Sequence, residues 1–160
     1  MSERTEFGAT RTVCGCAACQ TNCRHMPGYL IPADLDRMIP PDRDAFAWAE
    51  KNLLASPGAL VLQNGELFRI PTLVPAVQRD GSCIHFQADG QCAIHAVSPF
   101  GCAFFSCQSG PEAERLSARG LAAIAQDRQQ PGQYTLLWRY LWRRWKRQKS
   151  PYQLRQRMQP

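Results

Sequence analysis

Eight cysteines in two groups are the residues of this chain best suited to do chemistry. The first group is Cys14, Cys16, Cys19 and Cys23, and the second is Cys83, Cys92, Cys102 and Cys107. Thiolates are soft ligands, and several of them on one short segment can converge on a metal. Core packing of single cysteines does not explain this spacing. Three interpretations follow: a metal site, a thiol redox centre or a disulfide framework.

The expected cellular compartment favours metal binding among these three. The first residues, MSERTEFGATRTVCG, are polar and lack the apolar region of a secretory signal peptide. No apolar run approaches the roughly 20 residues that are needed to span a bilayer. We therefore expect a cytoplasmic protein. Thiols stay reduced in the cytoplasm, where clustered cysteines indicate a metal or redox site more often than disulfides.

The first cysteine group has the spacing of a metal knuckle. Cys16 and Cys19 are separated by two residues, and Cys23 follows after three more. Two sulfurs at this spacing can both reach one ion at about 2.3 Å. Folding would bring cysteines of the second group to the first, so all eight are candidate ligands. Zinc and iron–sulfur clusters both accept four thiolates. The spacing is compatible with two separate sites or with one shared site and spare thiols.

The segments CGCAACQTNC and CIHFQADGQCAIHAVSPFGCAFFSC resemble the YkgJ-type cysteine-cluster family, described as a zinc- or iron-chelating domain. The matching positions are Cys16, Cys19, Cys23, Cys83, Phe86, Gly90, Cys92, Ile94, Pro99 and Cys102. The resemblance implies metal chelation, by an iron–sulfur cluster of the 4Fe–4S type or by zinc. Arg24 replaces a further cysteine of the family pattern, and the additional Cys14 is a candidate substitute for that lost ligand.

Catalytic residues are not identified by the sequence. His25, His85 and His95 lie near the cysteines and are alternative ligands, although a structural role is the commoner one for each. No nucleophile–base pair and no glycine-rich phosphate loop stands out. A metal-dependent redox or transferase enzyme is therefore one alternative. A module whose metal is structural is another.

The elements that must position the cysteines indicate a small single α+β domain. Terminal helices, one or two short β-hairpins and irregular cysteine-rich metal-binding loops are expected. The predicted helices cover residues 31–39, 41–54, 111–126 and 134–149. The strands of the predicted hairpin cover residues 59–63 and 66–70. A second hairpin would have strands at 83–86 and 92–95. Asn64-Gly65 is a strong hairpin signal because both residues accept positive φ. We expect residues 13–25 to be irregular and a short helical turn to carry Cys102 and Cys107.

Charge divides the chain unevenly. Its net charge is +6, yet residues 1–127 contain 10 Lys and Arg against 13 Asp and Glu, and residues 128–160 contain 9 Lys and Arg without an acid. We predict a flexible segment 1–12, a metal-binding domain 13–127, and a basic tryptophan-rich helix and tail 128–160. The last helix carries an apolar stripe that includes Trp138, Trp142 and Trp145. Either this stripe packs on the domain, or the helix binds an acidic partner such as a protein, a nucleic acid or a membrane surface.

Overall fold

The computed structural model describes residues 8–9, 15–107 and 109–148. Cys14 and nearly all of the segment 1–12 lie outside the described residues. The elements are α1 (Ala17–His25), α2 (Pro32–Met38), α3 (Ala45–Asn52), β1 (Leu53–Gln63), β2 (Glu66–Pro75), the 3₁₀ helix η1 (His95–Val97), α4 (Phe100–Ala103), α5 (Pro111–Gln129) and α6 (Gln133–Gln148). This order confirms a small α+β domain whose two strands form one antiparallel hairpin.

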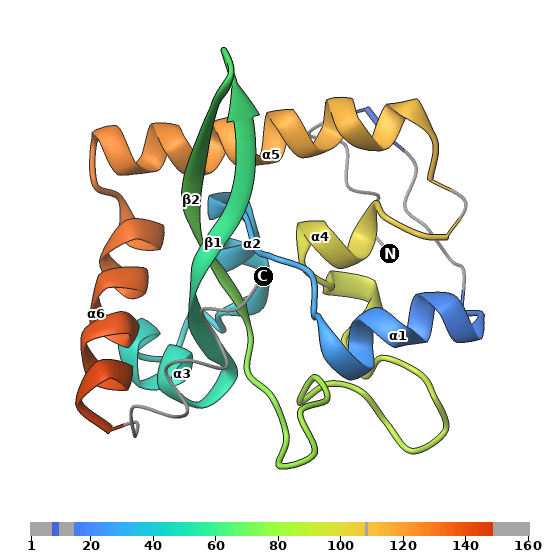
Figure 1. Cartoon of the computed structure of the whole chain (residues 1–160). Coiled ribbons are helices and arrows are strands. Elements are labelled where there is room, and N and C mark those ends of the chain that lie inside the picture. The colour runs from blue at the N-terminus through green and yellow to red at the C-terminus, as the bar shows by residue number, and fades with distance from the viewer. Residues whose placement is uncertain (1–7, 10–14, 108, 149–160) are drawn as a thin grey trace.

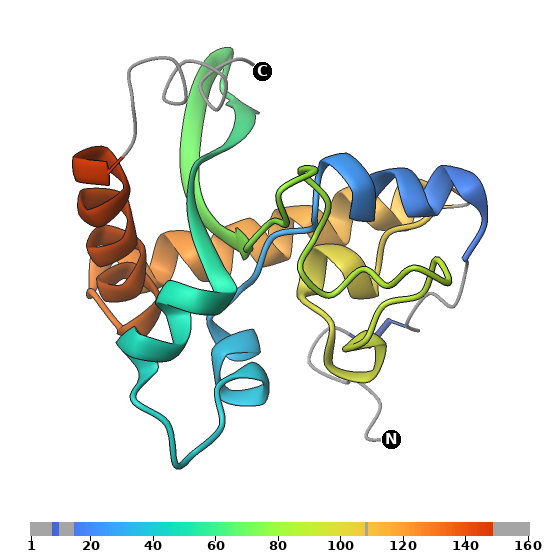
Figure 2. The ribbon, with the colours of Figure 1, turned by 90° about the horizontal axis from the view of Figure 1, so that it is seen from below.

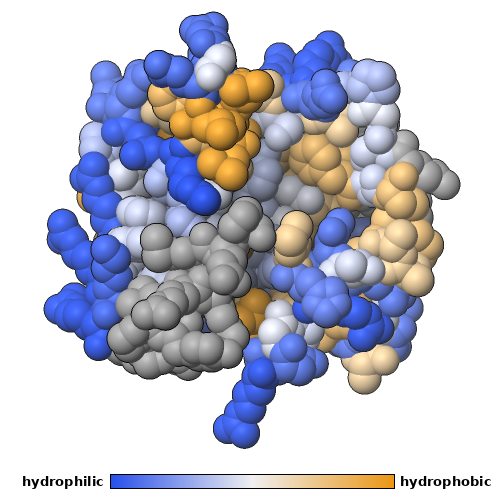
Figure 3. All heavy atoms as spheres, viewed as in Figure 1, coloured by the Kyte–Doolittle hydropathy of each residue, from blue (hydrophilic) through white to orange (hydrophobic). Residues whose placement is uncertain are grey.

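The hairpin turns where the sequence predicts it. Asn64 and Gly65 both have positive φ, at 53° and 80°, as a tight hairpin turn requires. The strands extend well beyond the predicted ranges, with Leu53 opposite Pro75 at the base. At the tip, Leu62 and Leu67 are each 69 % exposed. Figure 3 shows this apolar surface on the projecting part of the hairpin.

The long helix α5 joins two halves of the molecule (Figures 1 and 2). One half contains α2, α3, α6 and the hairpin. The other contains α1, α4 and the loops between β2 and α4. The candidate ligands lie in this second half, on α1, on the loops and around α4. The first half supplies most of the buried apolar core.

The apolar stripe of α6 packs on the domain. Tyr134, Leu137 and Leu141 are buried in the main core, and Trp145 is buried as well. Helix α6 contacts β1, α5 and α3. The packing follows from the amphipathic pattern, because apolar residues recur at helical spacing on the buried side. The first interpretation of the tryptophan stripe is therefore observed in the structure.

Tyr134 connects three segments of this core through its hydroxyl group. The hydroxyl donates to the Leu30 carbonyl at 2.7 Å and accepts the Leu73 N–H at 2.7 Å. Burial raises the pKa of Tyr134 well above its usual range, so the hydroxyl stays protonated as a donor. Helix α6 thereby holds β2 beside the segment that leads from α1 to α2.

Tyr134→Phe should destabilise the protein by about 1–3 kcal/mol, because the buried Leu73 N–H loses its acceptor. Urea unfolding followed by far-UV circular dichroism would measure the change. Tyr29→Phe is the control. The hydroxyl of Tyr29 lies 3.4 Å from Ser117 Oγ and is only partly buried, so the change should be small. Equal unfolding midpoints for wild type and Tyr134→Phe would contradict the prediction.

Three local expectations are corrected by the structure. Residues 17–25 form helix α1 instead of an irregular loop. Residues 83–95 turn back on themselves, but they form isolated bridges, including Phe86 with Cys92, rather than a second regular hairpin. Helix α4 carries Cys102 but ends at Ala103, so Cys107 lies beyond it.

Candidate metal centre

Helix α1 presents three of the predicted ligands. Cys16 is its N-cap, and Cys19 and Cys23 are one turn apart on the same face. None of the residues of α1 is buried. Apolar burial therefore does little to hold this helix in place. Bound metal would supply the missing stabilisation, because ligand binding contributes directly to folding.

Cys16 and Cys19 meet Cys107, which lies far away in the sequence. The ligand atoms of these three residues all lie within 4.8 Å of one another. The Sγ atoms of Cys16 and Cys107 are 3.5 Å apart. The Cys107 N–H donates to Cys19 Sγ at 3.3 Å. We call Cys16, Cys19 and Cys107 the exposed triad, since two of its members are exposed and the third is partly buried.

The other four described cysteines line one cleft. We call them the cleft thiols: Cys23, Cys83, Cys92 and Cys102. The cleft has a volume of about 1000 Å³ and runs between the cysteine loops and the hairpin. Its walls include Tyr29 and Phe86, and Cys19 also reaches it. The two cysteine groups of the sequence are thus mixed in space, because Cys23 lies with the later cysteines and Cys107 with the earlier ones.

Burial and neighbouring thiols control the charge of two of the cleft thiols, Cys83 and Cys102. Burial is the main cause that raises the pKa of Cys83 to about 11 and that of Cys102 to about 12. The charges of neighbouring cleft thiols raise both values further. Backbone N–H groups oppose this effect, among them the N–H of Gly28, which lies 3.3 Å from Cys102 Sγ. Without metal, both thiols are therefore protonated at neutral pH.

Two glycines, Gly28 and Gly101, allow the segment that follows α1 to pass close to the segment that carries Cys102. A Cβ atom on Gly28 would lie 2.2 Å from the carbonyl carbon of Gly101, and one on Gly101 would lie 2.5 Å from the Tyr29 nitrogen. The Gly101 N–H donates to the Tyr29 carbonyl at 2.9 Å across this crossing. Residues with side chains would force the two backbones apart. No sequence motif marks either glycine as functional, although Gly28 follows the first cysteines closely and Gly101 directly precedes Cys102.

The three candidate histidines differ in their surroundings. His85 lines the cleft, and its buried Nε2 has no hydrogen-bond partner among the residues that the structure describes. Burial lowers the pKa of His85, which favours the neutral imidazole that binds metals. His95 also lines the cleft, but it is exposed, as is His25. This buried imidazole nitrogen lines the same cleft as the thiols, so His85 is a further candidate ligand.

Comparison of the chain with models of known protein families, with curated proteins and with solved structures finds no match. Within the described ranges, no helix has both the length and the apolar character that a membrane span requires. The chemistry of the site therefore has to be inferred from its own residues. The seven described cysteines lie in one half of the molecule, and the ligand atoms of three of them lie within 4.8 Å of one another, so the site is compatible with metal binding.

Proposed function

We propose that this protein holds an iron–sulfur cluster or zinc through its clustered cysteines. The exposed triad carries this inference, because three sulfurs within 4.8 Å of one another form most of a coordination shell. The cleft thiols and His85 add further soft donors. The order of the cysteines supports membership of the YkgJ-type family, which we propose on the sequence motif alone. When bound, a cluster would supply electron transfer and zinc would supply a Lewis acid.

Metal analysis of protein purified without oxygen tests this function. Iron, acid-labile sulfide and zinc should be found in the wild-type protein, together with visible absorption if a cluster is present. Changing Cys16, Cys19 and Cys107 together to serine should reduce the metal content. Colourless protein without metal under these conditions would refute the proposal.

Metal affinity should fall steeply as the pH is lowered from 8 to 6. The raised pKa values of Cys83 and Cys102, about 11 and about 12, mean that both thiols carry protons that metal must displace. Each displaced proton changes the apparent affinity about tenfold per pH unit, so these two thiols predict about a hundredfold change per unit. Competition with a chromogenic chelator at pH 6, 7 and 8 would measure this slope, after correction for protonation of the chelator. An affinity independent of pH would contradict the prediction.

A metal-dependent redox or transferase enzyme is the first alternative. The cleft favours it, because a small molecule could enter beside the thiols. Among the residues that the structure describes, the exposed triad offers three ligands, and a metal bound by three protein ligands keeps a position for substrate. Addition of imidazole to protein loaded with Co²⁺, a spectroscopically visible substitute for zinc, should then change its electronic or paramagnetic spectrum. An unchanged spectrum would indicate a closed, structural site.

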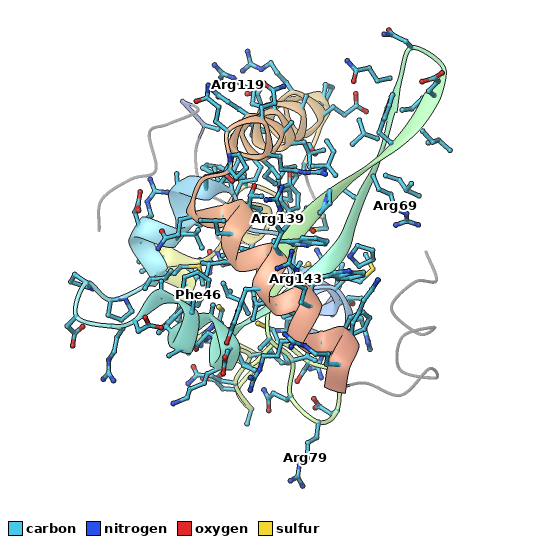
Figure 4. All side chains as sticks on the ribbon, turned by 90° about the vertical axis from the view of Figure 1, so that its left-hand side faces the viewer. Phe46, Arg69, Arg79, Arg119, Arg139 and Arg143 are labelled. Atoms are coloured by element: carbon cyan, nitrogen blue, oxygen red, sulfur yellow. The ribbon has the colours of Figure 1, made fainter. Side chains whose placement is uncertain are left out.

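A second candidate function is the binding of an acidic partner by helix α6. Arg139 and Arg143 lie on α6 on the same side of the molecule as Phe46 (Figure 4). Arg147 continues the four-residue spacing, and Leu136 is exposed like Phe46. Together with Tyr140, these residues line a groove of about 310 Å³. Among the residues that the structure describes, none of these three arginines has a carboxylate partner. Arg144, in contrast, lies 3.2 Å from Glu50.

An acidic peptide with one aromatic residue is the ligand that suits this groove, because apolar side chains lie between its cations. A fluorescent peptide of this kind should bind, and Arg139→Gln with Arg143→Gln should weaken the binding at least tenfold. Arg119→Gln on α5 is the charge-matched control. Removal of residues 128–160 would be a poor test, since it deletes the buried Tyr134 and Leu137. Stronger binding of single-stranded DNA than of the peptide would favour a nucleic-acid partner instead.

A further inference from the structure

We infer that the thiols build two metal centres of different kinds. The exposed triad would hold a single ion of the zinc type, and the cleft thiols would hold an iron–sulfur cluster. This inference rests on the proposed metal-binding function and adds the division of the ligands, which their order in the sequence does not reveal.

The geometry of helix α1 separates the two sets. Cys16 and Cys23 are seven residues apart on the same helix, which corresponds to about 10 Å along the helix axis. A zinc ion binds sulfur at about 2.3 Å and cannot span such a distance. Cys19 lies between them, but its sulfur is within 4.8 Å of the other two triad sulfurs and accepts the N–H of Cys107. The two ends of α1 therefore serve different sites.

The sulfur spacing of each set suits a different metal. Around one tetrahedral zinc ion, neighbouring sulfurs lie about 3.8 Å apart, as follows from bonds of about 2.3 Å. The triad is close to this value, with Cys16 and Cys107 separated by 3.5 Å. Among the described residues, no three of the cleft thiols come within the 4.8 Å that the triad satisfies. Sulfurs spaced more widely fit a cluster, because each iron atom binds a different cysteine.

The exposed triad and the cleft thiols also differ in their exposure to solvent. Cys16 and Cys107 are exposed and do not line the cleft, so the triad lies at the surface. The cleft thiols approach one another from three segments: Cys23 on α1, Cys102 on α4, and the loop between them. The Cys83 N–H donates to the Cys23 carbonyl at 2.8 Å, and the Gly28 N–H approaches Cys102 Sγ. Both sets accept a backbone N–H at sulfur, since the Cys107 N–H donates to Cys19 Sγ, so exposure and not hydrogen bonding distinguishes them.

Two double variants, reconstituted without oxygen in the presence of iron, sulfide and zinc, test the division. Cys16→Ser with Cys107→Ser should lose zinc and keep iron, sulfide and the visible absorption. Cys83→Ser with Cys92→Ser should lose iron, sulfide and the absorption and keep zinc. Loss of both metals from either folded variant would overturn the inference, since it would indicate one shared site. Circular dichroism of each variant shows whether it is folded.

The wild-type chain provides a measurement that does not depend on how the variants fold. Wild-type protein should hold zinc and iron at the same time after reconstitution. If zinc and iron instead displace one another, so that a chain never contains both, the two-centre inference fails while the proposed metal binding stands. Wild-type protein that takes up no metal of any kind would refute the proposed function itself.

Discussion

Replacing Gly28 with alanine is expected to abolish metal retention and to destabilise the protein by about 2 kcal/mol or more. The added Cβ would lie 2.2 Å from the Gly101 carbonyl carbon, and backbone cannot move aside as a flexible side chain can. The segment after α1 would then separate from α4. Cys102 would lose the approach of the Gly28 N–H, and its distance from the thiols on α1 would increase. Metal content after desalting and the urea midpoint measure the two effects.

Gly15→Ala is the matched control for this prediction. Gly15 lies on the same side of the molecule, just before α1, and a Cβ there would meet nothing within 4 Å. Its replacement should leave metal content and stability close to those of the wild type. Gly101→Ala should reproduce the defect of Gly28→Ala, because its Cβ would meet the same crossing from the other side. Normal metal retention in Gly28→Ala would show that the crossing does not position the ligands.

Asp34→Ala should be comparably damaging, at about 3 kcal/mol. The carboxylate of Asp34 is fully buried. Its Oδ2 atom accepts the N–H of Ile31 at 2.9 Å and that of Phe100 at 2.8 Å. One side chain therefore caps α2 and also holds the first residue of α4, the helix that carries Cys102. Without it, two buried N–H groups lose a charged acceptor, and each such loss costs about 1.5–3 kcal/mol.

Asp36→Ala is the control that distinguishes the loss of the buried Asp34 hydrogen bonds from the loss of one negative charge. Asp36 lies on the same helix, but its side chain is exposed. Its removal should change the free energy of unfolding by less than about 0.5 kcal/mol. Thermal unfolding of the metal-free and metal-loaded forms of both variants would measure the difference. Equal stabilities for Asp34→Ala and Asp36→Ala would contradict the anchoring role of Asp34.

Local signals in the sequence predicted most of the elements. Asn64-Gly65 identified the hairpin because the turn depends only on neighbouring residues. Pro111 and the residues after it predicted α5, since proline is favoured at the first position of a helix. The apolar spacing of α6 predicted both the helix and its buried side. Helix α1 was missed because it has no buried residue, and hence no apolar stripe to reveal it.

The grouping of the candidate ligands could not be predicted from spacing. Cys19 and Cys23 are close in the sequence, yet Cys19 lies beside Cys107 and Cys23 lies with the other cleft thiols. The reason is that one turn of α1 separates Cys19 from Cys23 along the helix axis. The Gly28–Cys102 contact joins residues that are 74 positions apart. No local pattern encodes such a contact. The sequence therefore identified which residues are candidate ligands, but it did not show how they are divided.

The meeting of Cys19 with Cys107 has a consequence during synthesis. The two residues are separated by 88 positions. At about 5–20 residues per second, the ribosome needs roughly 4–18 s to make the intervening chain. During that interval the thiols of α1 leave the ribosome without their partners. If the thiols bind metal, the complete exposed triad can therefore form only after translation has passed Cys107.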